Sequence, residues 1–203
     1  MIDSYRTVEA PADARIARLR SRFVCQLLPV SELEHIPTHL DRIRREMHDA
    51  SHHCHAYRIL DGDAHSAGYD DDGEPHGSAG EPILRQIEAA DLTNILAVVT
   101  RYFGGAKLGI GGLIRAYGDA VRAALERASV VRRELRTSLQ LLVPQQAGGS
   151  VMGLVHRYGG VIKDTQYADR ARIIASLAPS RVDPFIGALR ELTGDRAQWK
   201  ALS

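Results

Sequence analysis

A glycine-rich segment in the middle of the chain constrains the fold more than any other feature. The apolar, β-branched run at 95–100 predicts a buried strand, and Arg101 leads from it into a loop. Apolar residues then recur every three or four positions over 113–128, which predicts a helix. The segment therefore predicts a strand, a loop and a helix in succession. The glycines of the loop are Gly104, Gly105, Gly109, Gly111 and Gly112.

This order of elements favours an anion-binding site. Glycine lets a ligand approach the main chain closely, and the first turn of a helix has unpaired N–H groups and a positive dipole end. Such a turn can hold a phosphate or a carboxylate. Lys107 inside the loop, with Arg101 and Arg115 beside it, adds positive charge. We predict that these cations and the five glycines bind an anion; the alternative is a tight, closely packed turn that binds nothing.

Composition and charge narrow the class of protein. No apolar run approaches the roughly 20 residues that cross a bilayer. The polar residues at 1–20 lack the apolar core of a secretion signal, so we do not expect them to act as one. Cys25 and Cys54 are too few for a disulfide framework, so we expect reduced thiols in a cytoplasmic protein. Because there is no long apolar run, we expect no membrane contact. Residues 61–91 carry nine acidic side chains against one arginine, whereas 101–136 carry eight basic side chains against three acidic ones. These blocks can pair with each other, or the basic block can face phosphates.

The first part of the chain alternates predicted strands and helices. Pro37 lies inside the first helical pattern and should kink that helix or delay its start. Ser78 and Glu81 suggest a capping box for the second helix, but Pro82 prefers the first helical position, and we favour the proline. The expected elements are a leading strand within 1–20, strands at 22–30, 53–60 and 67–69, and helices at 33–47 and 82–89.

A charged passage at 127–137 predicts a domain boundary, which gives domains at 1–132 and 137–203. The second domain has the order β-α-β-β-α-β, which is the ferredoxin-like plan. Its expected elements are strands at 139–144, 161–167, 171–177 and 197–201, with helices at 146–158 and 183–192.

An acidic loop lies at 70–82. Its carboxylates are the hard oxygen ligands that magnesium or calcium prefers, but their spacing is not that of an EF-hand, and consecutive aspartates cannot all face one ion. We favour a solvated turn that caps a helix and neutralises arginines, and we predict no metal. The residues expected to support the anion site are Asp71, Asp72, Gly73 and Glu74. The weak metal candidates are Asp71, Asp72 and Glu74.

Histidines and nucleophiles are the other chemical candidates. The cluster at 52–55 contains three histidines and Cys54, but alternate residues of a strand face opposite sides, so a metal would need further ligands such as His76. We favour a structural strand. Cys54 or Ser78 could act as a nucleophile, but nothing resembles a nucleophile elbow, so we predict no catalytic residue.

The order and spacing of several short motifs resemble the YigZ/IMPACT family. The resemblance covers about 20–128 as the IMPACT-type domain, and about 137–200 as the small C-terminal domain of bacterial members. Two departures are His76, where small residues are usual, and Pro37 within a helix. The motifs are Ser21-Arg22-Phe23, His53-Cys54, Asp71-Asp72-Gly73-Glu74-Pro75, Gly77-Ser78-Ala79-Gly80, Pro82, Arg101-Tyr102-Phe103-Gly104-Gly105, Lys107-Leu108-Gly109, Gly111-Gly112-Leu113 and Arg115-Ala116-Tyr117.

The resemblance implies an α+β protein. Its N-terminal domain should have the ribosomal-protein-like (second-domain type) α/β fold shared with translational GTPases and GHMP-type kinases. Its C-terminal domain should resemble the last domain of a translocation elongation factor. Eukaryotic relatives restrain a stress kinase that controls translation initiation, by competing for the activator of that kinase. Their contact with the activator also involves an additional N-terminal domain, so this partner is not carried over.

We therefore expect a non-catalytic regulator of translation, linked through its family to the stress response, that binds RNA or the ribosome. In this hypothesis the loop amides and the three cations hold phosphate, and no cofactor is needed. One alternative is an enzyme that acts on a small phosphorylated or nucleotide ligand at the same loops. The other alternative is a protein-interaction module.

Overall fold

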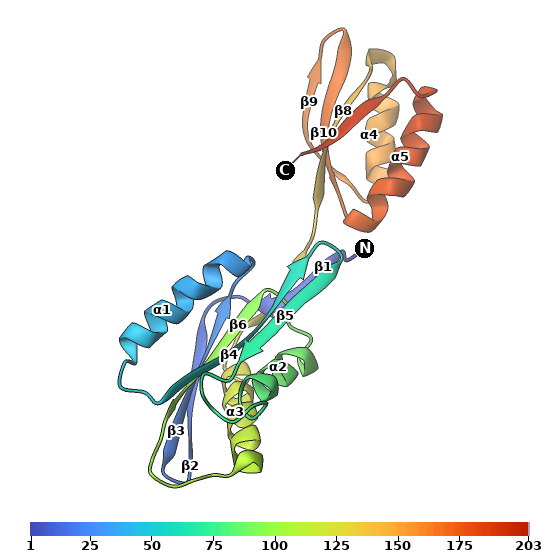
Figure 1. Ribbon diagram of the computed structural model, residues 1–203. Coiled ribbons are helices and arrows are strands. Elements are labelled where there is room, and N and C mark those ends of the chain that lie inside the picture. The colour runs from blue at the N-terminus through green and yellow to red at the C-terminus, as the bar shows by residue number, and fades with distance from the viewer. Residues whose placement is uncertain (203) are drawn as a thin grey trace. The chain divides into compact units, whose positions relative to one another are not determined.

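The computed structural model describes residues 1–202, which form two units (Figure 1). Residues 6–133 make the N-terminal unit, and residues 1–5 join the described residues from 134 onward in the C-terminal unit. The sequence had predicted that residues 1–132 form one domain. The first five residues differ because the Asp3 carboxylate accepts hydrogen bonds from the Ser180 amide (2.9 Å) and hydroxyl (2.6 Å).

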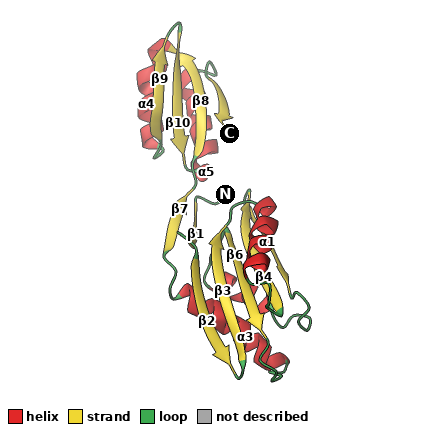
Figure 2. Ribbon diagram, turned by 90° about the vertical axis from the view of Figure 1, so that its left-hand side faces the viewer, coloured by secondary structure: helices red, strands yellow, loops and turns green. Residues whose placement is uncertain are grey.

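The N-terminal unit is a five-stranded antiparallel sheet in the order β2-β3-β6-β4-β5 (Figure 2). The central strand, β6, is buried over nearly its whole length, as expected for an apolar run that is covered on both faces. The strands are β2 (Ala12–Arg18), β3 (Ser21–Pro29), β4 (His52–Asp61), β5 (Ala64–Asp70) and β6 (Ile95–Tyr102).

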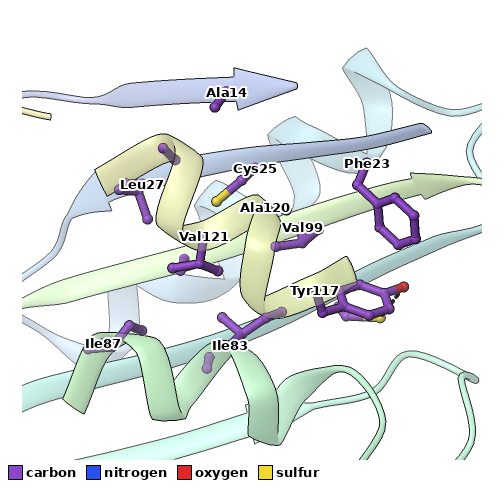
Figure 3. Close-up of a cluster of buried hydrophobic side chains, with 14 of the residues drawn as sticks. Ala14, Phe23, Cys25, Leu27, Ile83, Ile87, Val99, Tyr117, Ala120 and Val121 are labelled. Atoms are coloured by element: carbon purple, nitrogen blue, oxygen red, sulfur yellow. Dashed lines mark hydrogen bonds between the residues drawn. The ribbon is translucent and has the colours of Figure 1, made fainter. Parts of the chain in front are cut away.

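Helices α2 (Gly80–Ala89) and α3 (Ile110–Leu125) cover one face of this sheet, as Figure 3 shows for part of the core. The Tyr117 ring on α3 meets the Phe23 ring of β3 edge to face, with 5.2 Å between centroids. Such aromatic pairs add to the stabilisation from buried apolar area. This contact places the Tyr117 hydroxyl at the end of the core nearest the glycine loop.

Helix α1 (Ile36–Glu46) covers the other face. Its buried side chains, Leu40 and Ile43 among them, pack against Leu96 and Val98 of β6. Pro37 lies in the first helical turn, where its missing N–H costs nothing, and a short 3₁₀ turn (Leu33–His35) precedes the helix. The proline therefore delays the start of the helix, one of the two outcomes predicted for it.

Two local expectations differ from the structure. Helix α2 begins at Gly80, two residues before Pro82, because the acceptors for its first amides come from the Asp71 side chain rather than from a residue next to the helix. The charged passage at 127–137 does contain the division between the two units, after Arg133, but it also forms a strand that was not expected. This strand, β7 (Val130–Glu134), pairs with β1 (Ser4–Val8) in a two-stranded sheet.

The C-terminal unit has the predicted order β-α-β-β-α-β, and its four antiparallel strands follow the order β11-β8-β10-β9. The ferredoxin-like plan and the α+β class are thereby confirmed. Helix α5 begins four residues earlier than expected, at Pro179. The elements are β8 (Thr137–Pro144), α4 (Gly148–Arg157), β9 (Val161–Tyr167), β10 (Arg170–Leu177), α5 (Pro179–Thr193) and β11 (Gln198–Leu202). Among the described residues, no helix combines the length and apolarity needed to cross a membrane.

Candidate functional site

A cavity of about 420 Å³ opens in the N-terminal unit beside the glycine loop. Arg101 from the end of β6, Glu74 from the acidic loop, and Lys107 and Gly109 from the glycine loop all line it. The structure thus brings together residues that the sequence analysis had placed in two separate predicted loops. Most of the remaining wall is apolar, and Phe103 stands at its edge with 48% of its surface exposed.

The polar wall of the cavity is built on a buried ion pair. Arg101 Nη1 donates to Glu74 Oε1 over 2.6 Å, and the two side chains are only 6% and 4% exposed. The Tyr117 hydroxyl donates to the same oxygen over 2.7 Å. Burial, then the neighbouring Cys54 and Glu74, raise the pKa of Tyr117, so its phenol keeps its proton and serves as a donor.

Arg101 therefore has a different role from the one predicted. Its charge is neutralised by Glu74, and its guanidinium carbon lies 5.6 Å from the centroid of the Phe23 ring and 5.3 Å from that of the Phe103 ring. Its other terminal nitrogen donates to Ser21 Oγ over 3.4 Å. Arg101 thus shapes the wall, and the free positive charge near the loop comes from Lys107 and Arg115, which are both exposed.

The N-terminus of α3 is uncapped. Gly109 precedes the helix at φ 70° and provides no side-chain acceptor, and the first intrahelical bond runs from Leu113 N–H to Gly109 O (2.9 Å). Within residues 1–202, the amides of Ile110, Gly111 and Gly112 have no hydrogen-bond acceptor. Three N–H groups therefore point out of the positive end of the helix dipole, beside a cavity that Gly109 and Ile110 line.

The loop glycines do not share one role. A Cβ on Gly104 would lie 1.8 Å from the Arg20 carbonyl oxygen, so this position is a close backbone approach. Gly105 has a φ of +82° and open space around it, which fits a turn. A Cβ on Gly111 would meet only the Arg115 guanidinium, at 3.9 Å, which places Arg115 next to the free amides. Gly104 therefore fits the closely packed turn, whereas anion binding by the loop stays a prediction.

The Asp71 carboxylate accepts hydrogen bonds at the start of α2. Its donors are the amides of Gly77 (2.8 Å), Ala79 (3.1 Å) and Gly80 (2.8 Å). A carboxylate at this place satisfies orphan donors and interacts favourably with the helix dipole. The residue therefore caps a helix and does not line the cavity.

The Asp72 carboxylate contacts β4 of the sheet and helix α1. It accepts the His53 amide over 2.6 Å and pairs with Arg44 over 3.2 Å. Burial alone would raise the pKa of Asp72, but this hydrogen bond and the Arg44 charge hold it below its ordinary value. Asp72 itself adopts φ 44° and Gly73 φ 85°, which turn the chain back toward Glu74. Among the described residues, no group of three or more His, Cys, Asp or Glu could hold a metal ion.

The remaining chemical candidates have structural partners. Cys54 Sγ lies 3.0 Å from the Asp71 carbonyl oxygen and 3.3 Å from the Tyr117 hydroxyl, and burial raises the pKa of its thiol. It is therefore not the thiolate that nucleophilic chemistry needs. The Ser78 hydroxyl donates to the Pro75 carbonyl (2.6 Å). Sequence reasoning missed the polar role of Tyr117, for which the one signal was a hydroxyl on an otherwise apolar helix face.

Residues 19–125, more than half of the chain, match the family described as the Impact N-terminal domain. The chain belongs to the IMPACT family. Residues 150–196 match a second family, described as a domain of unknown function (DUF1949). These matches confirm the resemblance that the motifs had indicated.

Relatives of this IMPACT-family chain match it over nearly its full length. It is 34% identical over 200 residues to IMPACT family member YvyE of Bacillus subtilis, covering 98% of this chain and 92% of the relative. It is 30% identical to IMPACT family member YigZ of Escherichia coli, with 99% of each chain covered. A solved structure titled as a hypothetical protein superposes with a TM-score of 0.69 at 30% identity, covering 100% of this chain and 99% of the other.

Proposed function

We propose that this IMPACT-family protein is a non-catalytic regulator of translation that binds single-stranded RNA, free or within the ribosome, at the cavity beside the glycine loop. The observation that carries the proposal is the group of unpaired amides at Ile110, Gly111 and Gly112. These amides form the first turn of α3, the end of the helix where a phosphate is favoured. A role in translation would place the protein in the cytoplasm.

Two exposed cations complete the phosphate site in this proposal. Lys107 lies in the loop before α3, and Arg115 lies one turn into the helix, near the Gly111 position. Among the described residues, no carboxylate lies within 4.0 Å of either side chain, so both charges are available to a ligand. Arg101 is left out of this role because Glu74 neutralises it.

The cavity provides the second half of a nucleotide site. Phe103 is exposed at its edge, and an aromatic ring beside a positively charged loop is the usual platform on which a base of single-stranded RNA stacks. A base in the cavity and its phosphate at the start of α3 would then be one nucleotide bound at two neighbouring places.

The enzyme alternative would use the same cavity for a small phosphorylated ligand. It has less support, because neither Cys54 nor Tyr117 lines the cavity, and burial moves the pKa of the Cys54 thiol further above neutrality. A protein-interaction module would use the apolar wall, and its binding would depend little on salt.

The test is an anisotropy titration of a fluorescein-labelled oligouridine with the full chain at about 50 mM and about 200 mM salt. Affinity should fall steeply between the two concentrations, and Lys107→Ala should weaken binding and reduce the salt slope by about 1. Lys163→Ala, at an exposed position on β9, is the matched control and should change neither. An absence of binding at both salt concentrations would refute the proposal.

A further inference from the structure

We propose that the cavity selects guanine over the other bases of the bound RNA. This inference rests on the proposed function, because it assigns the identity of the base that the same site holds. Two hydrogen-bond acceptors on the polar wall of the cavity, Glu74 Oε2 and His52 Nε2, carry the argument.

Glu74 presents a free carboxylate oxygen to the cavity. Its Oε1 accepts both the Arg101 and Tyr117 bonds, whereas its Oε2 has no partner among the described residues. The side chain is 4% exposed, and the cavity is the open space that it lines. Oε2 is not among the fully buried side-chain atoms that lack a partner, so a ligand in the cavity can reach it and donate a charge-assisted hydrogen bond to it.

His52 supplies the second acceptor. Its Nδ1 lies 2.8 Å from the Asp72 carbonyl oxygen, which can only accept, so Nδ1 carries the proton. In the neutral ring, Nε2 is then the acceptor. Nε2 lies 3.9 Å from Glu74 Oε1, and both residues line the same cavity. The wall therefore offers two neighbouring acceptors, one of them on a carboxylate.

Guanine is the base that matches this pair. Its Watson–Crick edge carries two adjacent donors, N1–H and the N2 amine, whereas the edges of adenine, cytosine and uracil each place an acceptor beside a single donor. An acceptor turned toward Glu74 would be repelled, so the wall rejects the other bases as well as favouring guanine. A cavity of about 420 Å³ lies within the usual size range of small-ligand sites, and Phe103 can cover a base plane.

The test compares labelled oligouridines that carry one central guanosine, inosine, adenosine or cytidine, each titrated with the full chain. Guanosine should bind about tenfold more tightly than the all-uridine oligomer. Inosine retains N1–H but lacks the N2 amine, so its affinity should lie between those two.

A pair of variants tests the assigned acceptors. His52→Ala should lower the ratio of guanosine to uridine affinity, and His48→Ala, at an exposed histidine after α1, should leave that ratio unchanged. Glu74→Gln should also lower the ratio, but it alters the partner of Arg101. Should that variant fail to fold, the inosine titration and the His52→Ala variant still test the proposal.

The outcomes separate this inference from the proposed function. Equal affinity for all oligomers, or a preference for another base, would overturn the guanine assignment and leave RNA binding standing. A guanosine preference that survives unchanged in His52→Ala and is matched in full by inosine would overturn it too. An absence of binding to every oligomer would overturn both.

Discussion

Replacing Gly104 with alanine should destabilise the N-terminal unit by about 2–4 kcal/mol. The new Cβ would lie 1.8 Å from the Arg20 carbonyl oxygen and 2.1 Å from its carbon, so backbone must move by more than about 1 Å to reach the 3.0 Å that real Cβ atoms keep. That movement would break the bonds from the Gly104 amide to Ser21 Oγ (3.3 Å) and from the Phe103 amide to Ser51 Oγ (3.1 Å). Each such bond contributes about 0.5–1.5 kcal/mol, and overpacking adds about 1–3 kcal/mol.

Two glycines of the same loop serve as matched controls. Gly105→Ala meets no atom within 4 Å but sits at φ +82°, so only backbone strain of about 1–2 kcal/mol is expected. Gly111→Ala meets nothing closer than 3.9 Å and lies in the helix, where alanine is better than glycine by up to about 1 kcal/mol. The expected order of destabilisation is therefore Gly104, then Gly105, with Gly111 neutral or stabilised.

Urea unfolding followed by far-UV circular dichroism measures these differences. Trp199 is the only tryptophan of the chain and belongs to the C-terminal unit, so its fluorescence should report an unchanged transition in all three variants. If Gly104→Ala were no less stable than Gly111→Ala, the close approach to the Arg20 backbone would not be what requires glycine there, and the reasoning would be wrong.

Three further substitutions test other contacts. Asp71→Ala should lower the free energy of unfolding by about 2 kcal/mol, because the amide of Gly80 at the start of α2 and two amides just before it lose their acceptor. An unchanged urea midpoint would contradict this. Arg101→Met should lower the free energy of unfolding by about 3–5 kcal/mol, because it leaves Glu74 as an unpaired buried charge. Adding Glu74→Gln should restore part of that loss. A double variant no more stable than Arg101→Met would contradict the assigned role of the Arg101–Glu74 ion pair. Burial lowers the pKa of His55, so as the pH drops below about 6.5 the unfolded chain binds a proton that the folded chain does not, and the free energy of unfolding should fall. Thermal unfolding at several pH values should show a weaker pH dependence of stability for His55→Gln. An equal pH dependence in both proteins would show that His55 is not the group responsible.

Several features of the fold could be predicted from the sequence because they depend on residues close together in the chain. The apolar run of β6 and the three-and-four spacing on α3 identify their elements directly. The position of Pro37 set the start of α1, and the strand and helix order of the C-terminal unit determined its ferredoxin-like plan. Motif order and spacing also pointed to the IMPACT family.

The roles of the charged residues were decided only by the tertiary structure. The sequence shows that Glu74 and Arg101 are charged, but not that two residues 27 positions apart pair inside the core, where Tyr117 joins them. It likewise gave Asp71 and Asp72 equal standing, whereas the fold turns one toward the amides of α2 and the other toward β4 and α1. The physical reason is that local spacing sets secondary structure, whereas the partner of a side chain depends on which distant segments the packed sheet and helices bring within hydrogen-bond distance.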